Sequence, residues 1–216
     1  AYMFETIRLI FLPIILAQSL GGTLNPKINC LYQENHKKEA KIVAEKSTGF
    51  IIKLLIPIIF IFKLFSKEIY SLFYSQENGA LILYHISDLI LFFGLYKVLI
   101  GIVFGLPRSH YIIIATIISG AAKYSLNYLL IPKYGYLGAI YATEIAIVIC
   151  ILEAYYVLYL EQINIFVKSL KTLLKAFISG FLSIFVVVFF AIISNIQIFK
   201  LQICVRDYHP CVRQCY

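Results

Sequence analysis

Long apolar runs, interrupted by few charges, constrain the fold of this chain more than any motif does. They fill most of its 216 residues, and only 14% of the residues are charged, against about a quarter in soluble domains. One helix of about 20 apolar residues crosses the hydrocarbon core of a bilayer. The chain contains about six such runs, which we place near residues 6–26, 47–65, 80–105, 109–131, 134–160 and 171–197.

These runs predict helices and not the strands of a membrane barrel. Barrel strands alternate apolar and polar residues over about ten positions, whereas the runs here are long and unbroken. A helix also satisfies its backbone hydrogen bonds within its own segment, as lipid requires. We therefore expect an all-α, polytopic membrane helix bundle with about six transmembrane helices. Residues 1–200 are expected to form the membrane domain, and residues 201–216 a short polar tail that contains cysteines.

The basic residues indicate how the helices cross the membrane. They gather between the first two runs, after the third run and after the fifth run, as Lys27, Lys37, Lys38, Lys41, Lys46, Arg108, Lys168, Lys171 and Lys175. The positive-inside rule makes these loops cytoplasmic and places both ends of the chain outside. The formal net charge of +8 is spread over loops and not over one soluble face, so we expect no nucleic-acid partner. Because residue 1 is Ala and no secretory signal is visible, we expect a fragment of a longer protein.

Two connecting segments have the pattern of short surface helices. Residues 29–47 alternate Lys and Glu, which favours a helix within a solvated connector. Residues 63–78 place their apolar side chains on one face, which predicts an amphipathic helix in the outer interface. Pro13 and Pro57 fall inside two of the apolar runs, where we expect each to kink its helix.

The cysteines do not have the spacing of a standard metal site. Cys30 and Cys150 are isolated and look like small apolar residues. The tail holds three more, with His209 nearby, at positions Cys204, Cys211 and Cys215. Their spacing leaves metal binding, a disulfide in an oxidising exterior and no chemistry at all as alternatives. We expect neither a metal nor a cofactor.

Ionisable residues within the apolar runs are the first candidates for function, because a charge at membrane depth costs a few kcal/mol. Lys123 and Glu144 lie about ten residues before and after a turn at Lys133, which puts both about 15 Å deep, near the midplane. They could pair with each other across two antiparallel helices. They could instead face a water-filled cavity and bind an anionic substrate or a coupling cation. The spacing leaves both hypotheses open.

The remaining ionisable residues lie nearer the surfaces. His85 and Asp88 are an i,i+3 pair near the outer end of the third run, where they could gate a path, relay protons or line a hydrated mouth. Lys97 and Glu153 lie about 10 Å from the cytoplasmic surface, within reach of water. The chain has no nucleophile elbow, phosphate loop or catalytic pair of carboxylates, so we do not expect an enzyme.

The hairpin between the fourth and fifth runs resembles a known motif. It reads Asn127-Tyr-Leu-Leu-Ile-Pro132-Lys-Tyr-Gly135-Tyr-Leu-Gly138-Ala139-Ile-Tyr-Ala142-Thr143. This is similar to the Asn-x-x-Leu-Ile-Pro-x-x-Gly-x-x-Gly-Ala-x-x-Ala-Thr pattern of polysaccharide flippases, within the multidrug/oligosaccharidyl-lipid/polysaccharide exporter superfamily. Residues 101–107 resemble the family's Gly-x-Leu-Gln-Gly-Leu-Gly segment and following Pro, although the Gln and the last Gly are absent. Over residues 6–160 the subgroup that the chain resembles is the stage V sporulation protein B type.

The resemblance implies a two-lobed flippase fold, of which this chain supplies one part. It implies a multi-pass protein of a bacterial plasma membrane that moves a lipid-linked sugar or peptidoglycan precursor by alternating access. Its partners would be the substrate, membrane lipids and a missing N-terminal lobe. A multidrug cation antiporter of the same superfamily and a membrane scaffold or assembly protein without transport remain alternatives.

Two sets of candidate residues follow from the motif and from the ionisable positions. The structural motif consists of Asn127, Pro132, Gly135 and Gly138. The candidates for the substrate or ion pathway are Arg8, Gln18, Ser19, His85, Asp88, Lys123 and Glu144.

Overall fold

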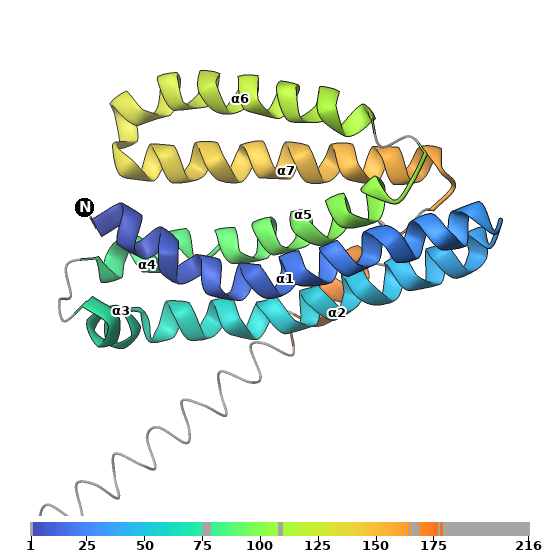
Figure 1. The fold of residues 1–216 in the computed structure, drawn as a ribbon. Coiled ribbons are helices and arrows are strands. Elements are labelled where there is room, and N and C mark those ends of the chain that lie inside the picture. The colour runs from blue at the N-terminus through green and yellow to red at the C-terminus, as the bar shows by residue number, and fades with distance from the viewer. Residues whose placement is uncertain are drawn as a thin grey trace, which may run out of the picture. The chain divides into compact units, whose positions relative to one another are not determined.

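The computed structural model describes residues 2–74, 79–107, 110–163, 165, 169–176 and 178. Seven helices between residues 2 and 160 form the fold (Figure 1). In chain order they are α1 Tyr2–Gln33, α2 Lys37–Leu64, α3 Ser66–Tyr74, α4 Ala80–Ile86, α5 Leu89–Phe104, α6 Tyr111–Tyr134 and α7 Tyr136–Leu160. Residues 1–176 form one compact unit, to which all seven belong. Within the described ranges there is no strand, and the predicted all-α fold is confirmed.

Four of the predicted membrane spans have a matching helix, since α1, α2, α6 and α7 are each long and apolar enough to cross a membrane. The helices α4 and α5, bent by 42° at a short break, supply a fifth if the pair is counted as one span. The predicted sixth span, 171–197, lies mostly outside the described residues. The predicted domain boundary at residue 200 and the cysteine tail 201–216 lie outside them as well.

The first connector is much shorter than predicted. Because α1 continues to Gln33 and α2 begins at Lys37, the expected solvated connector over residues 29–47 is a tight turn between two long helices. Asn35 takes the left-handed φ of 59° in this turn, a conformation that Asn tolerates better than most residues. At 1.5 Å per residue, both helices exceed the length that a core of about 30 Å requires. Their lysine-rich ends therefore extend past the membrane core as helix and not as loop.

The helix α3 forms in the segment that the apolar pattern predicted. Leu72 and Phe73 are exposed on one side, whereas Tyr70 is fully buried on the other. The Tyr70 hydroxyl donates to the Glu5 carboxylate, and the Tyr74 hydroxyl donates to the Glu5 carbonyl oxygen at 3.0 Å. Burial, reinforced by the hydrogen bond to Glu5, raises the pKa of Tyr70. These contacts attach α3 to the beginning of α1.

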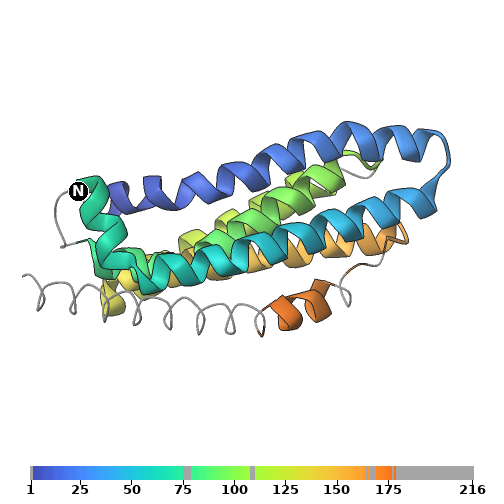
Figure 2. The same cartoon turned by 90° about the horizontal axis from the view of Figure 1, so that it is seen from below.

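The helix α5 occupies the centre of the bundle and packs against α1, α2 and α7 (Figure 2). Glycines allow α1 and α5 to approach closely. A Cβ atom on Gly21 would collide with the Lys97 carbonyl oxygen, and one on Gly101 would collide with the Gly21 backbone. Small residues serve this purpose in membrane bundles, where close van der Waals packing holds helices together.

The helices α6 and α7 form an antiparallel hairpin at the edge of the bundle (Figure 1). Pro132 lies in the last turn of α6, and Gly135 then reverses the chain with φ 58° and ψ −132°, a conformation that essentially only glycine adopts. Gly138 lets α7 pass the Leu130 carbonyl oxygen, with which a Cβ atom would collide. These residues give the hairpin motif a structural explanation.

Candidate functional site

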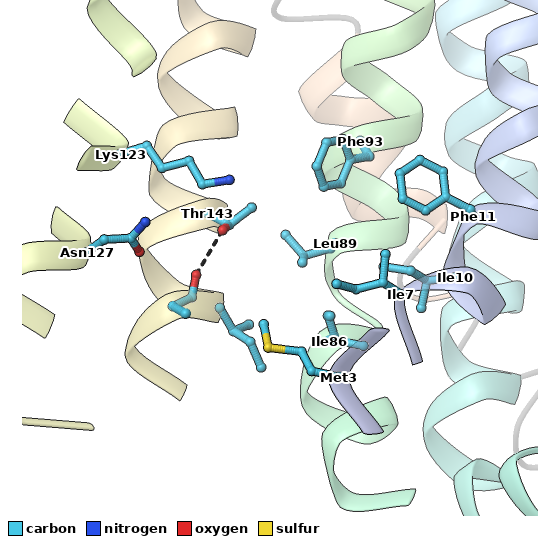
Figure 3. A pocket seen from close by; sticks show the side chains of 12 residues that line it. Met3, Ile7, Ile10, Phe11, Ile86, Leu89, Phe93, Lys123, Asn127 and Thr143 are labelled. Carbon is cyan, nitrogen blue, oxygen red and sulfur yellow. Dashed lines mark hydrogen bonds between the residues drawn. The ribbon is translucent and has the colours of Figure 1, made fainter. Parts of the chain in front are cut away.

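A pocket of about 310 Å³ lies between the α6–α7 hairpin and the helices α1, α4 and α5 (Figure 3). The hairpin reaches the rest of the described bundle mainly through the packing of α7 on α5. Among the described elements, α1 makes no extensive contact with α6 or α7, and the pocket occupies the space between them. All the lining residues come from the half of the bundle that the lysine distribution predicts to be outer.

The two walls of the pocket differ in chemistry. Apolar side chains of α1, α4 and α5 form one wall, and among them are Ile7, Phe11, Ile86, Leu89 and Phe93. The hairpin supplies Lys123 and Asn127 from α6 and Thr143 from α7 to the opposite wall. Figure 3 shows the Lys123 side chain extending from α6 past Thr143 toward the apolar wall. The pocket therefore combines a cation and hydrogen-bonding groups with a large apolar surface.

The predicted ion pair between Lys123 and Glu144 is not formed. In the described part of the chain, ion pairs within 4.0 Å join His36 to Glu39 and Lys63 to Asp88. The physical reason is the phase of α7: successive residues turn by about 100°, so Glu144 does not share the face of Thr143 and does not line the pocket. Lys123 is left lining the pocket, which keeps the alternative of an anionic ligand open.

Asn127 brings an unsatisfied acceptor to the pocket. Its Oδ1 atom is buried and has no hydrogen-bond partner, while the nearby Thr143 hydroxyl donates to the Ala139 carbonyl oxygen at 2.8 Å (Figure 3). Asn127 also borders a more open pocket of about 400 Å³ with Tyr124 and Tyr128. Buried acceptors are normally satisfied, so Oδ1 is a natural partner for a ligand hydroxyl or a water.

The pathway candidates His85 and Asp88 lie on either side of a bend, and their side chains have different partners. The chain bends between α4, which contains His85, and α5, which Asp88 precedes. Asp88 accepts a hydrogen bond from the Lys63 ammonium at 2.8 Å, whereas the His85 ring meets the edge of Tyr84. Sequence reasoning missed Lys63 because the residue was assigned to the interfacial segment. The sequence did contain a signal for this pair, because Lys63 and Asp88 carry opposite charges near the outer ends of successive predicted spans.

The three candidates on α1 lie outside the pocket. Arg8, Gln18 and Ser19 are all exposed, and the Ser19 hydroxyl donates to the Ile15 carbonyl oxygen at 3.0 Å. The structure does not bring them together with Lys123 or Glu144, so their role in a pathway stays a prediction.

The carboxyl group of Glu153, nearer the predicted cytoplasmic end of α7, does not reach water as expected. Glu153 is half-buried, and its Oε2 atom is enclosed without a hydrogen-bond partner. Within the described ranges, no three His, Cys, Asp or Glu side chains surround one point in a way that could hold a metal ion. The chemistry of the pocket thus comes from Lys123, Asn127 and Thr143.

Comparison with known proteins adds one structural relative. No family model and no curated protein matches the chain. The solved structure of "Lipid II flippase MurJ, inward closed conformation" matches it with a TM-score of 0.69 and 23% identity, over 87% of this chain and 40% of that one. The chain thus has the helical membrane fold of part of that protein, and spans less than half of its length.

Proposed function

We propose that this chain is part of a flippase that moves a lipid-linked sugar or peptidoglycan precursor across the plasma membrane of a bacterium. The two-sided pocket is the observation that carries the proposal. An amphiphilic substrate needs an apolar surface for its lipid and polar groups for its head, and both are present within one pocket. The fold supports the proposal as well, since the structural relative is described as a lipid II flippase.

Each polar group of the pocket has a place in the recognition of such a substrate. The Lys123 ammonium pairs with the phosphate that joins lipid to sugar through charge-assisted hydrogen bonds. The orphaned Oδ1 of Asn127 accepts a hydrogen bond from a sugar hydroxyl. The pocket is small for a whole lipid-linked sugar, so a second lobe completes the site and rocks against this one during alternating access. No bond is made or broken in this process.

The charge of Lys123 distinguishes this proposal from the export of cationic drugs. A cationic cargo would be repelled by the lysine in the pocket, whereas an anionic phosphate would be attracted. The pocket also favours a transporter over a scaffold protein, whose helices we expect to pack without a central cleft.

The test is transport by the whole protein that contains this sequence, reconstituted in vesicles. The probe is polyprenyl pyrophosphate carrying one N-acetylhexosamine. We expect Lys123→Ala to lower the initial rate about tenfold, or ~1.4 kcal/mol, because the phosphate loses its cation. Lys123→Arg keeps the charge and should retain most of the rate.

The matched control is Lys67→Ala, which removes an exposed lysine of α3 that does not line the pocket. It should transport at the normal rate. Normal transport by Lys123→Ala would remove this lysine from the substrate site, and no transport of the probe by the unaltered protein would contradict the proposed function itself.

A further inference from the structure

Lys63 bridges the two sides of the bend between α4 and α5. Its ammonium lies 2.8 Å from the Asp88 Oδ2 atom at the beginning of α5 and 5.3 Å from the centre of the Tyr84 ring on α4. The lysine itself belongs to the last turn of α2. Cation–π and ion-pair contacts from one ammonium therefore fix both halves of the bent span relative to α2.

The bend is also where the pocket begins. Ile86 is the last residue of α4 and Leu89 the first of α5, and both line the apolar wall. Only two residues separate them, Ser87 and Asp88, and the Ser87 hydroxyl is turned back to the Leu83 carbonyl oxygen. A change in the angle of 42° between α4 and α5 would therefore move one wall of the pocket directly.

A second carboxylate lies within electrostatic range of the same lysine. Glu144 on α7 is half-buried and interacts electrostatically with both Asp88 and Lys63. It follows Thr143, which lines the opposite wall of the pocket. The side chains of Lys63 and Asp88 keep 27% and 44% of their exposure, which leaves them room to rearrange.

We propose that Lys63 is a positioning residue that sets the width of the pocket by clamping the α4–α5 bend to α2, with Asp88 as its partner. The pocket serves transport only if the proposed function holds, but the clamp can be tested without any transport.

The experiment measures the reactivity of a cysteine placed at Leu89 in the whole protein. The other cysteines of this chain are replaced by Ala, and a charged methanethiosulfonate is the reagent. Leu89 is now almost fully buried, so its labelling reports movement of the bend. We expect Lys63→Met and Asp88→Asn each to raise the labelling rate about tenfold, because the bend loses its clamp.

Lys67→Met removes a more exposed lysine from the same end of the bundle and should not change the rate. The exchange of charges in Lys63→Asp with Asp88→Lys restores the pair and should return the rate close to its original value. This rescue separates loss of the clamp from loss of folding, because a variant that merely unfolds would not be rescued.

Glu144→Gln tests whether Asp88 is the partner that matters. It leaves the Lys63–Asp88 pair intact, so the labelling rate should stay unchanged. A labelling rate in Lys63→Met equal to that of Lys67→Met would overturn the clamp. A rate that rises in Glu144→Gln as much as in Asp88→Asn would overturn the assignment of Asp88 as the partner of Lys63.

Discussion

Gly135 shows how one residue decides the geometry of the α6–α7 hairpin. Its φ of 58° and ψ of −132° lie in a region that side chains make costly, yet no atom lies within 4 Å of where its Cβ would be. The need for glycine here comes entirely from the backbone and not from packing.

Gly135→Ala should therefore destabilise the protein by about 1–3 kcal/mol. The matched control is Gly120→Ala on α6, where a Cβ also meets nothing but the backbone conformation is ordinary. Alanine there should leave stability unchanged or improve it, by up to about 1 kcal/mol, since it favours a helix. Thermal unfolding of the purified protein in detergent measures both, and equal melting temperatures for the two variants would contradict the role of the backbone.

Single residues also show what sequence reasoning can and cannot give. Counting residues from the turn placed Lys123 and Glu144 at similar depth, and Lys123 does line the pocket. The predicted pair failed because depth along a helix says nothing about direction around it, and direction depends on which neighbour the helix packs against. Lys63 was missed for a related reason, since its partner Asp88 is 25 residues away and meets it only through tertiary packing.

At the scale of elements, the crossing of α1 and α5 depends on the absence of side chains. Gly21 and Gly101 let the two backbones touch, and both are buried. The next residue, Gly22, faces open space. The chain therefore contains two adjacent glycines with opposite surroundings.

We expect Gly21→Ala to separate the two helices and cost about 1–3 kcal/mol, because the atom in its way is backbone and cannot rotate aside. Gly22→Ala should have no such cost. The fraction of folded protein after heating in detergent, followed by size-exclusion chromatography, compares the two. A Gly21→Ala variant as stable as Gly22→Ala would show that the close approach contributes little.

The sequence predicted the membrane helices better than the segments that connect them. Lipid forces backbone groups into helices, so an apolar run of sufficient length predicts a span whatever its neighbours are. The lysine-rich connector between the first two runs obeys no such constraint. It was expected to be solvated, but α1 and α2 propagate through it because its Lys and Glu residues are themselves good helix formers.

At the scale of the whole molecule, the outer half of α6 exposes polar side chains that no described element covers. Among the described elements α6 packs extensively only on α7, and Tyr124 and Tyr128 remain 78% and 77% exposed, with Lys123 and Ser125 also exposed. Exposed residues of its inner half, such as Ile117, are apolar. Lipid suits the inner half, whereas the outer half requires water or protein beside it.

Cysteine scanning of the whole protein in membranes should reveal this division of α6. Ser125→Cys should react with a charged thiol reagent, because its face borders water or a hydrated interface with a second lobe. Ile117→Cys should stay unreactive, because lipid covers it. Equal protection of both positions would mean that lipid surrounds the whole helix, and would argue against a hydrated pathway on that side.

Among the described elements, the α6–α7 hairpin is attached to the rest of the bundle mainly through α7. The glycine contact holds the backbones of α1 and α5 together, whereas the hairpin packs on the bundle along one side. We therefore expect the hairpin to tilt more easily than α1 and α5 separate. Substitutions between α7 and α5 should then alter this motion, and substitutions at Gly21 or Gly101 should alter stability.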